Sequence, residues 1–92
     1  MRKHGEWMTQ TDERILEFLS EFGNRQPHAI SDKFAEMGVD LDYHVQSINR
    51  RCWTLTDYGL VTNVGGGTYS ITELGKQFLD GDLDAGTLDP SE

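Results

Sequence analysis

The segment from Asp42 to Thr72 constrains the fold of this chain most, because helical, hairpin and capping patterns follow one another there in a fixed order. Apolar residues recur at helical spacing as far as Tyr58, and Gly59 follows them as a helix stop. Two short runs of β-branched and aromatic residues then flank three glycines, which is typical of a β-hairpin with a tight turn. Thr72 begins another helical pattern as its N-cap. This order predicts a mainly α-helical domain with a small β-hairpin.

Two helices are expected before this segment. Thr9 is a suitable N-cap for a helix over residues 10–22, and Gly23 follows as its stop. The apolar stripe of that helix comprises Ile15, Leu16, Phe18, Leu19 and Phe22. Pro27 suits the first turn of a second helix, which Gly38 ends. Its inward residues are expected to be Ala29, Ile30, Phe34 and Met37.

The third helix is expected over about residues 43–58, with Asp40 or Asp42 available as its cap. Its core face comprises Ile48, Cys52 and Leu55. Two hairpin registers remain open. A three-residue turn groups Val61, Asn63, Tyr69 and Ile71 on one face, and a four-residue turn groups Leu60, Thr62 and Val64 with Tyr69 and Ile71. Thr72 then caps a last helix that ends at Gly81 and whose inward residues are expected to be Leu74, Phe78 and Leu79.

The chain has 92 residues, of which 36% are hydrophobic, and this suits one small domain with a compact core. We expect that domain over residues 9–81, between an N-terminal arm over residues 1–8 and an acidic, mostly irregular tail over residues 82–92. The sequence contains neither an apolar run of membrane-spanning length nor the apolar stretch of a signal peptide. We therefore expect a cytoplasmic protein that does not bind membranes.

No constellation of chemistry-bearing side chains indicates an enzyme. The three histidines and the single cysteine lack the spacing of zinc ligands, and Cys52 falls on a core face. The three glycines of the hairpin lack the lysine and the following helix of a nucleotide-binding loop. No serine or cysteine nucleophile is placed beside a base. We expect no catalytic residue, no metal, no cofactor and no small-molecule ligand.

The third helix carries, away from its core residues, side chains that hydrogen-bond base edges or phosphates, and this predicts duplex DNA as the partner. These candidate DNA-binding residues are Tyr43, His44, Gln46, Ser47, Asn49, Arg50 and Arg51. Arg50 suits guanine, and Gln46 or Asn49 suits adenine. Arg51 is expected to touch a phosphate or to pair with a carboxylate. The hairpin tip is a second candidate contact and comprises Asn63, Gly65, Gly66, Gly67 and Thr68.

The net charge of -8 opposes DNA binding, because most nucleic-acid-binding domains are basic. The charge is uneven, however, since residues 43–72 hold Arg50 and Arg51 against Asp57 as their one acidic residue. Three lysines stand against sixteen carboxylates, a composition that resembles proteins of salt-accumulating archaea. In molar salt the Debye length falls to about 3 Å, so acidic side chains and phosphates repel one another only near contact.

Four strings narrow the comparison with known families: TQTDERILEFL over residues 9–19, YGLV over 58–61, YSITELG over 69–75 and LDGDLDA over 79–85. They are similar to haloarchaeal transcription regulators of the phage phi-H repressor type, which have a winged helix-turn-helix fold. The resemblance covers roughly Thr9 to Gly81 and implies a DNA-binding repressor. It also implies that the third helix enters the major groove and that the hairpin, the wing, lies beside it.

Two departures from the family pattern are visible. Cys52 stands where many relatives have leucine, and the wing over residues 63–68 contains no arginine or lysine. The bare wing and the acidity favour an alternative, a protein–protein interaction module without direct DNA readout.

A homodimer is expected, because a domain this small reads only a short site alone. Its candidate contact residues are Trp7, Trp53 and Phe78.

Overall fold

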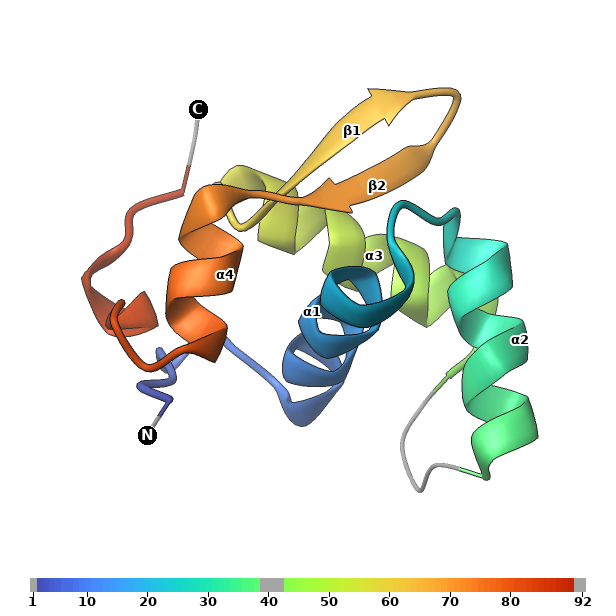
Figure 1. Cartoon of the computed structure of the whole chain (residues 1–92), viewed down its shortest axis with the longest axis horizontal. Coiled ribbons are helices and arrows are strands. Elements are labelled where there is room, and N and C mark those ends of the chain that lie inside the picture. Colours follow the sequence, from blue (N-terminus) through green and yellow to red (C-terminus); the bar gives the residue numbers. More distant parts are fainter. Residues whose placement is uncertain (1, 39–42, 91–92) are drawn as a thin grey trace.

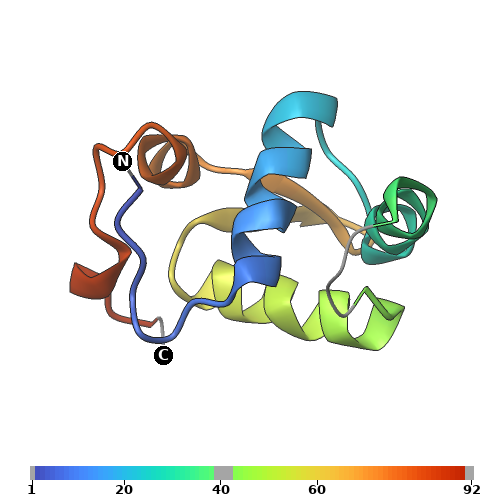
Figure 2. The same cartoon turned by 90° about the horizontal axis from the view of Figure 1, so that it is seen from below.

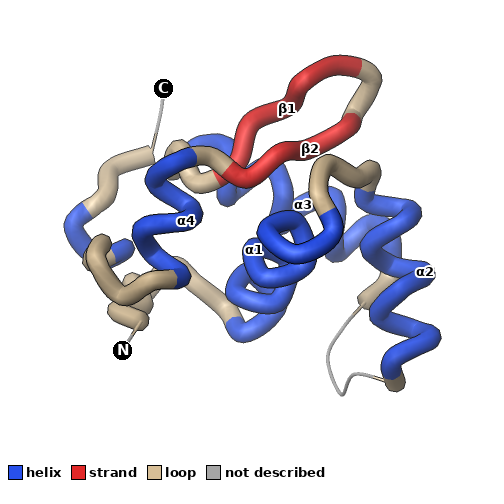
Figure 3. Tube along the Cα trace, viewed as in Figure 1, coloured by secondary structure: helices blue, strands red, loops and turns tan. Residues whose placement is uncertain are grey.

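The computed structural model describes residues 2–38 and 43–90, and its elements follow the expected order. They are α1 (Gln10–Phe22), α2 (Pro27–Met37), α3 (Val45–Asp57), β1 (Val61–Gly65), β2 (Thr68–Ile71), α4 (Glu73–Leu79) and a 3-10 helix, η1 (Ala85–Thr87). Figure 1 shows α1 in the centre, between α2 and α4, with the hairpin along one edge, and Figure 3 marks the helices and strands on the same view. The predicted mainly helical fold with one antiparallel hairpin is confirmed.

Thr9 begins α1 as expected. Its hydroxyl accepts a hydrogen bond from the Asp12 amide at 3.3 Å, while the Asp12 carboxylate accepts one from the Thr9 amide at 2.8 Å, which completes a capping box. Most of the predicted stripe is buried, but Phe22 is 40% exposed, so its predicted core position is wrong. Phe22 has the right helical phase but lies in the last turn, where it contacts the Phe18 ring and the Lys33 ammonium at the rim of the core.

Pro27 lies in the first turn of α2, and Gly38 ends the helix in the left-handed conformation, with φ of 66° and ψ of 33°. Ile30 and Phe34 are buried, as the periodicity predicts. Met37 is 59% exposed, so its predicted core position is wrong. Like Phe22, Met37 occupies the final turn of its helix, where packing partners are fewest.

The third helix, α3, begins at Val45, two residues later than expected, with His44 in the N-cap position. The predicted caps, Asp40 and Asp42, lie outside the described residues. All three predicted core residues of α3 have no exposed surface: Ile48, Cys52 and Leu55. Burial raises the pKa of the Cys52 thiol to about 12, with a smaller contribution from the nearby Asp12 charge, so Cys52 serves as a small core residue.

The hairpin adopts the first of the two open registers. Val61 pairs with Ile71 and Asn63 with Tyr69, and a bulge lies between Asn63 and Gly65. Gly66 and Gly67 form the tip with φ of 60° and 80°, as two-residue hairpin turns require. The bulge adds the residue that allows this shorter turn to give the register expected for a longer one.

A contact that the sequence pattern does not predict joins the hairpin to the α1–α2 connector. The Arg25 amide donates to the Tyr69 carbonyl at 3.1 Å, and the Tyr69 amide donates to the Arg25 carbonyl at 2.8 Å. This one-residue bridge fixes the hairpin beside the start of α2. A single bridging residue has no alternating pattern, so nothing local in the sequence indicates it.

Thr72 caps α4 as predicted, its hydroxyl accepting from the Gly75 amide at 3.2 Å. A Cβ on Gly75 would lie 2.4 Å from the Leu60 carbonyl, so this glycine allows α4 to pack directly on the base of the hairpin. Phe78 is fully buried, whereas Leu74 is 38% exposed and its predicted inward position is wrong. Leu74 lies in the first turn of α4 beside Gly59, which has no side chain to cover it.

The segments before α1 and after α4 lie side by side against the domain, as Figures 1 and 2 show. Lys3 forms a parallel bridge with Asp84, in which the Ala85 amide donates to the Lys3 carbonyl at 2.9 Å. The Trp7 indole stacks on the Tyr58 ring at 3.8 Å between ring centroids. Both terminal segments are thereby tied to the end of α3.

Within residues 2–38 and 43–90, no helix has the length and apolar character needed to cross a membrane.

Candidate nucleic-acid interface

The α3 helix presents one polar stripe to solvent. At about 100° per residue, positions 46, 50, 53 and 57 fall within about 60° of one another on the side opposite Ile48 and Cys52. The four side chains of this stripe, which we call the α3 outer face, are Gln46, Arg50, Trp53 and Asp57, and all are exposed. In Figure 2, α3 forms one side of the molecule and lies across the end of α1. The outer face is therefore open to a large partner.

The flanks of the outer face are hollowed. On one flank, Gln46 and Asn49 line a depression of about 310 Å³ whose other walls are the start of α2, at Pro27, and the wing tip, at Gly66 and Gly67. On the other flank, Ser47 and Arg50 border a second depression of about 350 Å³ beside the start of α1. Ser47 and Asn49 are partly buried along these margins. The structure thus brings together most of the predicted α3 contact residues.

The two remaining candidates near the start of α3 are Tyr43 and His44. Both are exposed, and their rings lie 6.4 Å apart between centroids. The His44 carbonyl accepts the Ile48 amide at 2.9 Å, which starts the helical hydrogen bonding. These residues therefore extend the α3 outer face at its N-terminal end.

The wing contributes backbone more than side chains. The Asn63 side-chain oxygen accepts a hydrogen bond from the Gly65 amide at 2.9 Å, so Asn63 shapes the bulge as well as lying near the tip. The Gln26 side-chain Nε2 donates to the Gly66 carbonyl at 3.3 Å and fixes the tip beside α2. Thr68 is partly buried next to this turn. The tip is positioned beside α3, with Gly66 exposed and Gly67 partly buried.

Arg51, another predicted DNA-contacting residue, also lines the second depression, but its guanidinium is engaged within the chain. Its Nε donates to Asp12 Oδ1 at 2.7 Å, and its Nη2 donates to Asp12 Oδ2 at 2.6 Å and to the Trp7 carbonyl at 3.1 Å. Asp12 has no exposed surface, and its hydrogen bonds raise the pKa of Arg51. The alternative expected from the sequence, pairing with a carboxylate, is confirmed. One residue of helical rotation separates this buried ion pair from Arg50.

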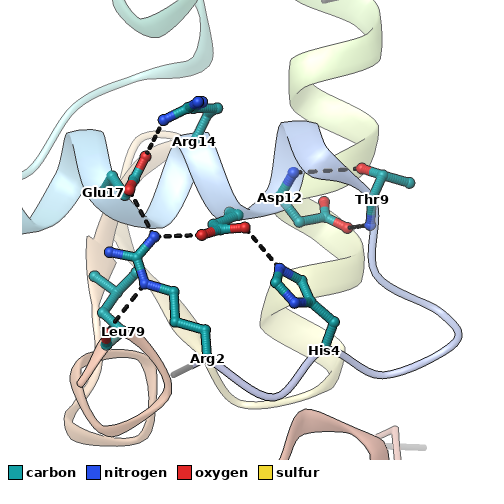
Figure 4. Close-up of polar contacts among 8 residues, drawn as sticks. Arg2, His4, Thr9, Asp12, Arg14, Glu17 and Leu79 are labelled. Atoms are coloured by element: carbon teal, nitrogen blue, oxygen red, sulfur yellow. Dashed lines mark hydrogen bonds and ion pairs between the residues drawn. The ribbon is translucent and has the colours of Figure 1, made fainter. Parts of the chain in front are cut away.

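Two further arginines, Arg2 and Arg14, are also engaged by carboxylates, those of Glu13 and Glu17 on α1. Figure 4 shows Arg2 reaching from the N-terminal arm to the acidic face of α1, where it pairs with Glu13 and with Glu17, the latter at 2.6 Å. Arg14 also pairs with Glu17, at 2.9 Å. Within the part of the chain that the structure describes, no carboxylate lies within ion-pair distance of Arg50. The cation at the centre of the α3 outer face is thus available to an external anion.

Trp53, predicted from the sequence as a candidate dimer contact, is 59% exposed on the α3 outer face. Its exposure leaves it accessible to a partner of either kind, a second copy or a nucleic acid. Trp53 follows Gln46 by seven residues and Arg50 by three, a helical spacing that is visible in the sequence once α3 is in phase.

The other two candidate dimer residues are held within the chain to different degrees. Phe78 is fully buried within its own chain and is unavailable to a partner, so that prediction is wrong. Trp7 is partly buried, stacks on Tyr58 and donates its indole N–H to the Ala85 carbonyl at 3.0 Å. The monomer therefore provides a place for Trp7.

Among the described residues, no group of three or more histidine, cysteine, aspartate or glutamate side chains is arranged to hold a metal ion.

Comparison with known proteins agrees with this geometry. A family model described as a winged helix-turn-helix phage repressor matches residues 1–91. The repressor protein of Halobacterium phage phiH is 28% identical over 92 residues, which cover 97% of this chain and 98% of that protein. The crystal structure of the PhiH1 repressor-like protein from Haloarcula marismortui shares 37% identity and a TM-score of 0.86, with 98% of this chain and 97% of that chain covered.

Proposed function

This chain belongs to the winged helix-turn-helix phage repressor family of DNA-binding regulators, and from that premise we propose that it represses transcription by binding a specific duplex DNA sequence. The α3 outer face enters the major groove, and the wing tip lies along the adjacent backbone. Gln46, Asn49 and Arg50 contact base edges. Tyr43, His44 and Ser47 contact bases or phosphates near the start of the helix.

The observation that carries this proposal is the unpaired Arg50 at the centre of an exposed polar helix face. An α-helix of 13 residues is about 20 Å long, and a major groove about 12 Å wide accepts it lengthwise. The flanking depressions leave room for the two phosphate backbones on either side of α3. Arginine presents a planar fork of donors that matches the two acceptors of guanine.

The acidic character of the chain limits binding in dilute buffer and not in concentrated salt. Glu13 and Glu17 of α1 are engaged by Arg2 and Arg14, and Asp12 is engaged by Arg51. Asp57 is the carboxylate on the α3 outer face. At molar ionic strength the Debye length of about 3 Å removes most of the longer-range repulsion. Recognition then depends on short-range hydrogen bonds and packing.

Selection of bound sequences from random duplexes in molar potassium chloride tests the proposal. We expect a defined motif, and we expect Arg50→Ala to weaken binding to that motif by roughly 1 to 3 kcal/mol and to relax the preference at one base pair. The matched control is Lys76→Ala, which removes an exposed cation from α4. Failure to enrich any motif, together with capture of a protein partner through α3, would favour the interaction-module alternative.

Repression and dimerisation are further parts of the proposal. The phage phiH relative is named a repressor, which supports this direction of regulation. One α3 helix reads only a few base pairs, so we expect two copies on an inverted repeat with half-sites about 34 Å apart. Light scattering in high salt tests the dimer, and an operator–reporter assay tests repression. Such a regulator acts in the cytoplasm, where prokaryotic DNA lies.

A further inference from the structure

A large apolar side chain, Trp53, interrupts the polar α3 outer face. It is 59% exposed and follows Arg50 by one helical turn. Exposed indole surface is unfavourable in water, and aromatic residues left open on otherwise polar faces commonly mark contact sites. Its neighbours along the stripe are Gln46, Arg50 and Asp57, so Trp53 differs in chemistry from the hydrogen-bonding side chains around it.

Trp53 lies next to the core of the domain along α3. Its neighbour Cys52 has no exposed surface, whereas Trp53 itself is mostly exposed. The core residues Ile48, Cys52 and Leu55 hold the helix in place beneath it. What Trp53 offers to a partner is therefore apolar surface on a packed helix.

The major groove contains one apolar group that distinguishes base pairs, the C5-methyl of thymine. We infer that Trp53 is a specificity-determining residue whose indole packs against a thymine methyl in the major groove. The inference rests on the proposed function, because the same α3 outer face must enter the groove. Gln46 and Arg50 supply hydrogen bonds to neighbouring bases, and Trp53 adds an uncharged contact. Such a contact is insensitive to salt, which suits a protein with a net charge of -8.

Deoxyuridine scanning of the selected operator tests this assignment. Replacing thymine by deoxyuridine removes one methyl and leaves every hydrogen-bonding group in place. We expect one position per half-site at which the change weakens the parent protein about fourfold, the value of one buried methyl-sized group. Trp53→Ala should bind the thymine operator at least about fourfold more weakly and should lose its sensitivity to deoxyuridine at that position. Trp53→Phe, which keeps an aromatic ring, should retain part of the discrimination.

Two variants serve as matched controls. Met37→Ala removes an apolar side chain that is also 59% exposed but lies at the end of α2, and it should behave as the parent does. Arg50→Ala should bind more weakly overall yet keep the thymine preference at the Trp53 position, since it removes a different contact.

The outcomes separate this inference from the proposed function. If Trp53→Ala discriminates thymine from deoxyuridine as strongly as the parent does, methyl recognition by Trp53 is excluded while DNA binding stands. If Trp53→Ala instead converts a dimer to a monomer with discrimination unchanged, the indole belongs to a contact between two copies of this chain. If the parent selects no duplex, the proposed function fails and this inference fails with it.

Discussion

Two arginine–tryptophan pairs lie on different sides of α3 and have contrasting surroundings. Arg51 is fixed by two hydrogen bonds to the buried Asp12 and by one to the carbonyl of Trp7, whose ring is stacked on Tyr58. Arg50 and Trp53 are exposed on the α3 outer face. The first pair joins the arm, α1 and α3 into one unit. The second pair is left for a partner.

This contrast shows how an acidic protein retains the capacity to bind DNA. The chain has sixteen carboxylates and eight arginines and lysines, and several of these cations form ion pairs within the chain. Arg2, Arg14 and Arg51 are engaged in this way. The net charge therefore says less about function than the position of the few cations that remain unpaired. A rotation of about 100° between consecutive residues of α3 decides which arginine pairs with Asp12 and which is exposed for the proposed DNA contact.

The largest expected effect comes from breaking the buried pair. Arg51→Ala leaves the Asp12 carboxylate buried without its counter-ion, and we expect it to lower the free energy of unfolding by about 3 kcal/mol. Urea denaturation in constant molar potassium chloride measures the change. Arg50→Ala is the control and should change stability by no more than about 0.5 kcal/mol, because its side chain is exposed. Equal losses in the two variants would contradict the division between the two pairs.

Replacing Trp7 should destabilise the fold more than replacing Trp53, as replacing Arg51 should destabilise it more than replacing Arg50. Trp7→Ala removes the stack on Tyr58 and the hydrogen bond to Ala85, and we expect a loss of about 2 kcal/mol in unfolding free energy. Trp53→Ala should leave the melting temperature nearly unchanged while weakening DNA binding. Thermal denaturation followed by circular dichroism compares the two variants directly. A larger stability loss for Trp53→Ala would show that its indole is structural.

A smaller effect is expected on the acid side of the stability curve. Burial alone would raise the pKa of Glu13, but hydrogen bonds from Arg2 and His4 outweigh it and hold that pKa below its ordinary value of 4.5. The stabilisation is therefore present above pH 4.5 and is lost as the pH falls through the lower pKa of the folded state. Glu13→Gln should show a shallower decline in stability below that pH. A parallel decline in both proteins would show that this contact contributes nothing.

The smallest expected effect concerns the carboxylate on the α3 outer face. Asp57→Asn removes a charge that repels phosphates, so DNA affinity should rise about twofold at low salt and remain unchanged at molar salt. Fluorescence anisotropy with a labelled duplex measures both conditions. Glu13→Gln removes a charge from α1 and should leave the affinity unchanged. An increase of the same size at molar salt would point to a contact other than screened repulsion.

Local sequence patterns predict most of the framework and less of the surface. The Thr9 cap, Pro27, Gly38 and the Thr72 cap predict the ends of helices because capping depends on neighbouring residues. Periodicity predicts the phase of α3 correctly. It does not predict whether a neighbouring element extends far enough to cover the last turn, as Phe22 and Met37 show.

Long-range pairing is the other limit. Asp12 and Arg51 are 39 residues apart, and each has a local explanation of its own: a helix cap for Asp12 and a basic DNA contact for Arg51. Only the packing of α1 against α3 brings the two together. The same holds for Trp7 and Ala85, which meet because the arm and the tail lie side by side. The sequence therefore predicts which helix face forms the candidate site, but it does not predict which side chains on that helix are engaged within the chain instead.

Titration of the selected duplex into nitrogen-15-labelled protein, followed by NMR, tests the central claim most directly. We expect the amide resonances of residues 46–53 and of the wing tip at residues 65–67 to shift, together with the Trp53 indole N–H. The Trp7 indole N–H, held between Tyr58 and Ala85, should stay unchanged as an internal reference. Shifts concentrated in the arm and tail, with the α3 outer face unaffected, would contradict the account.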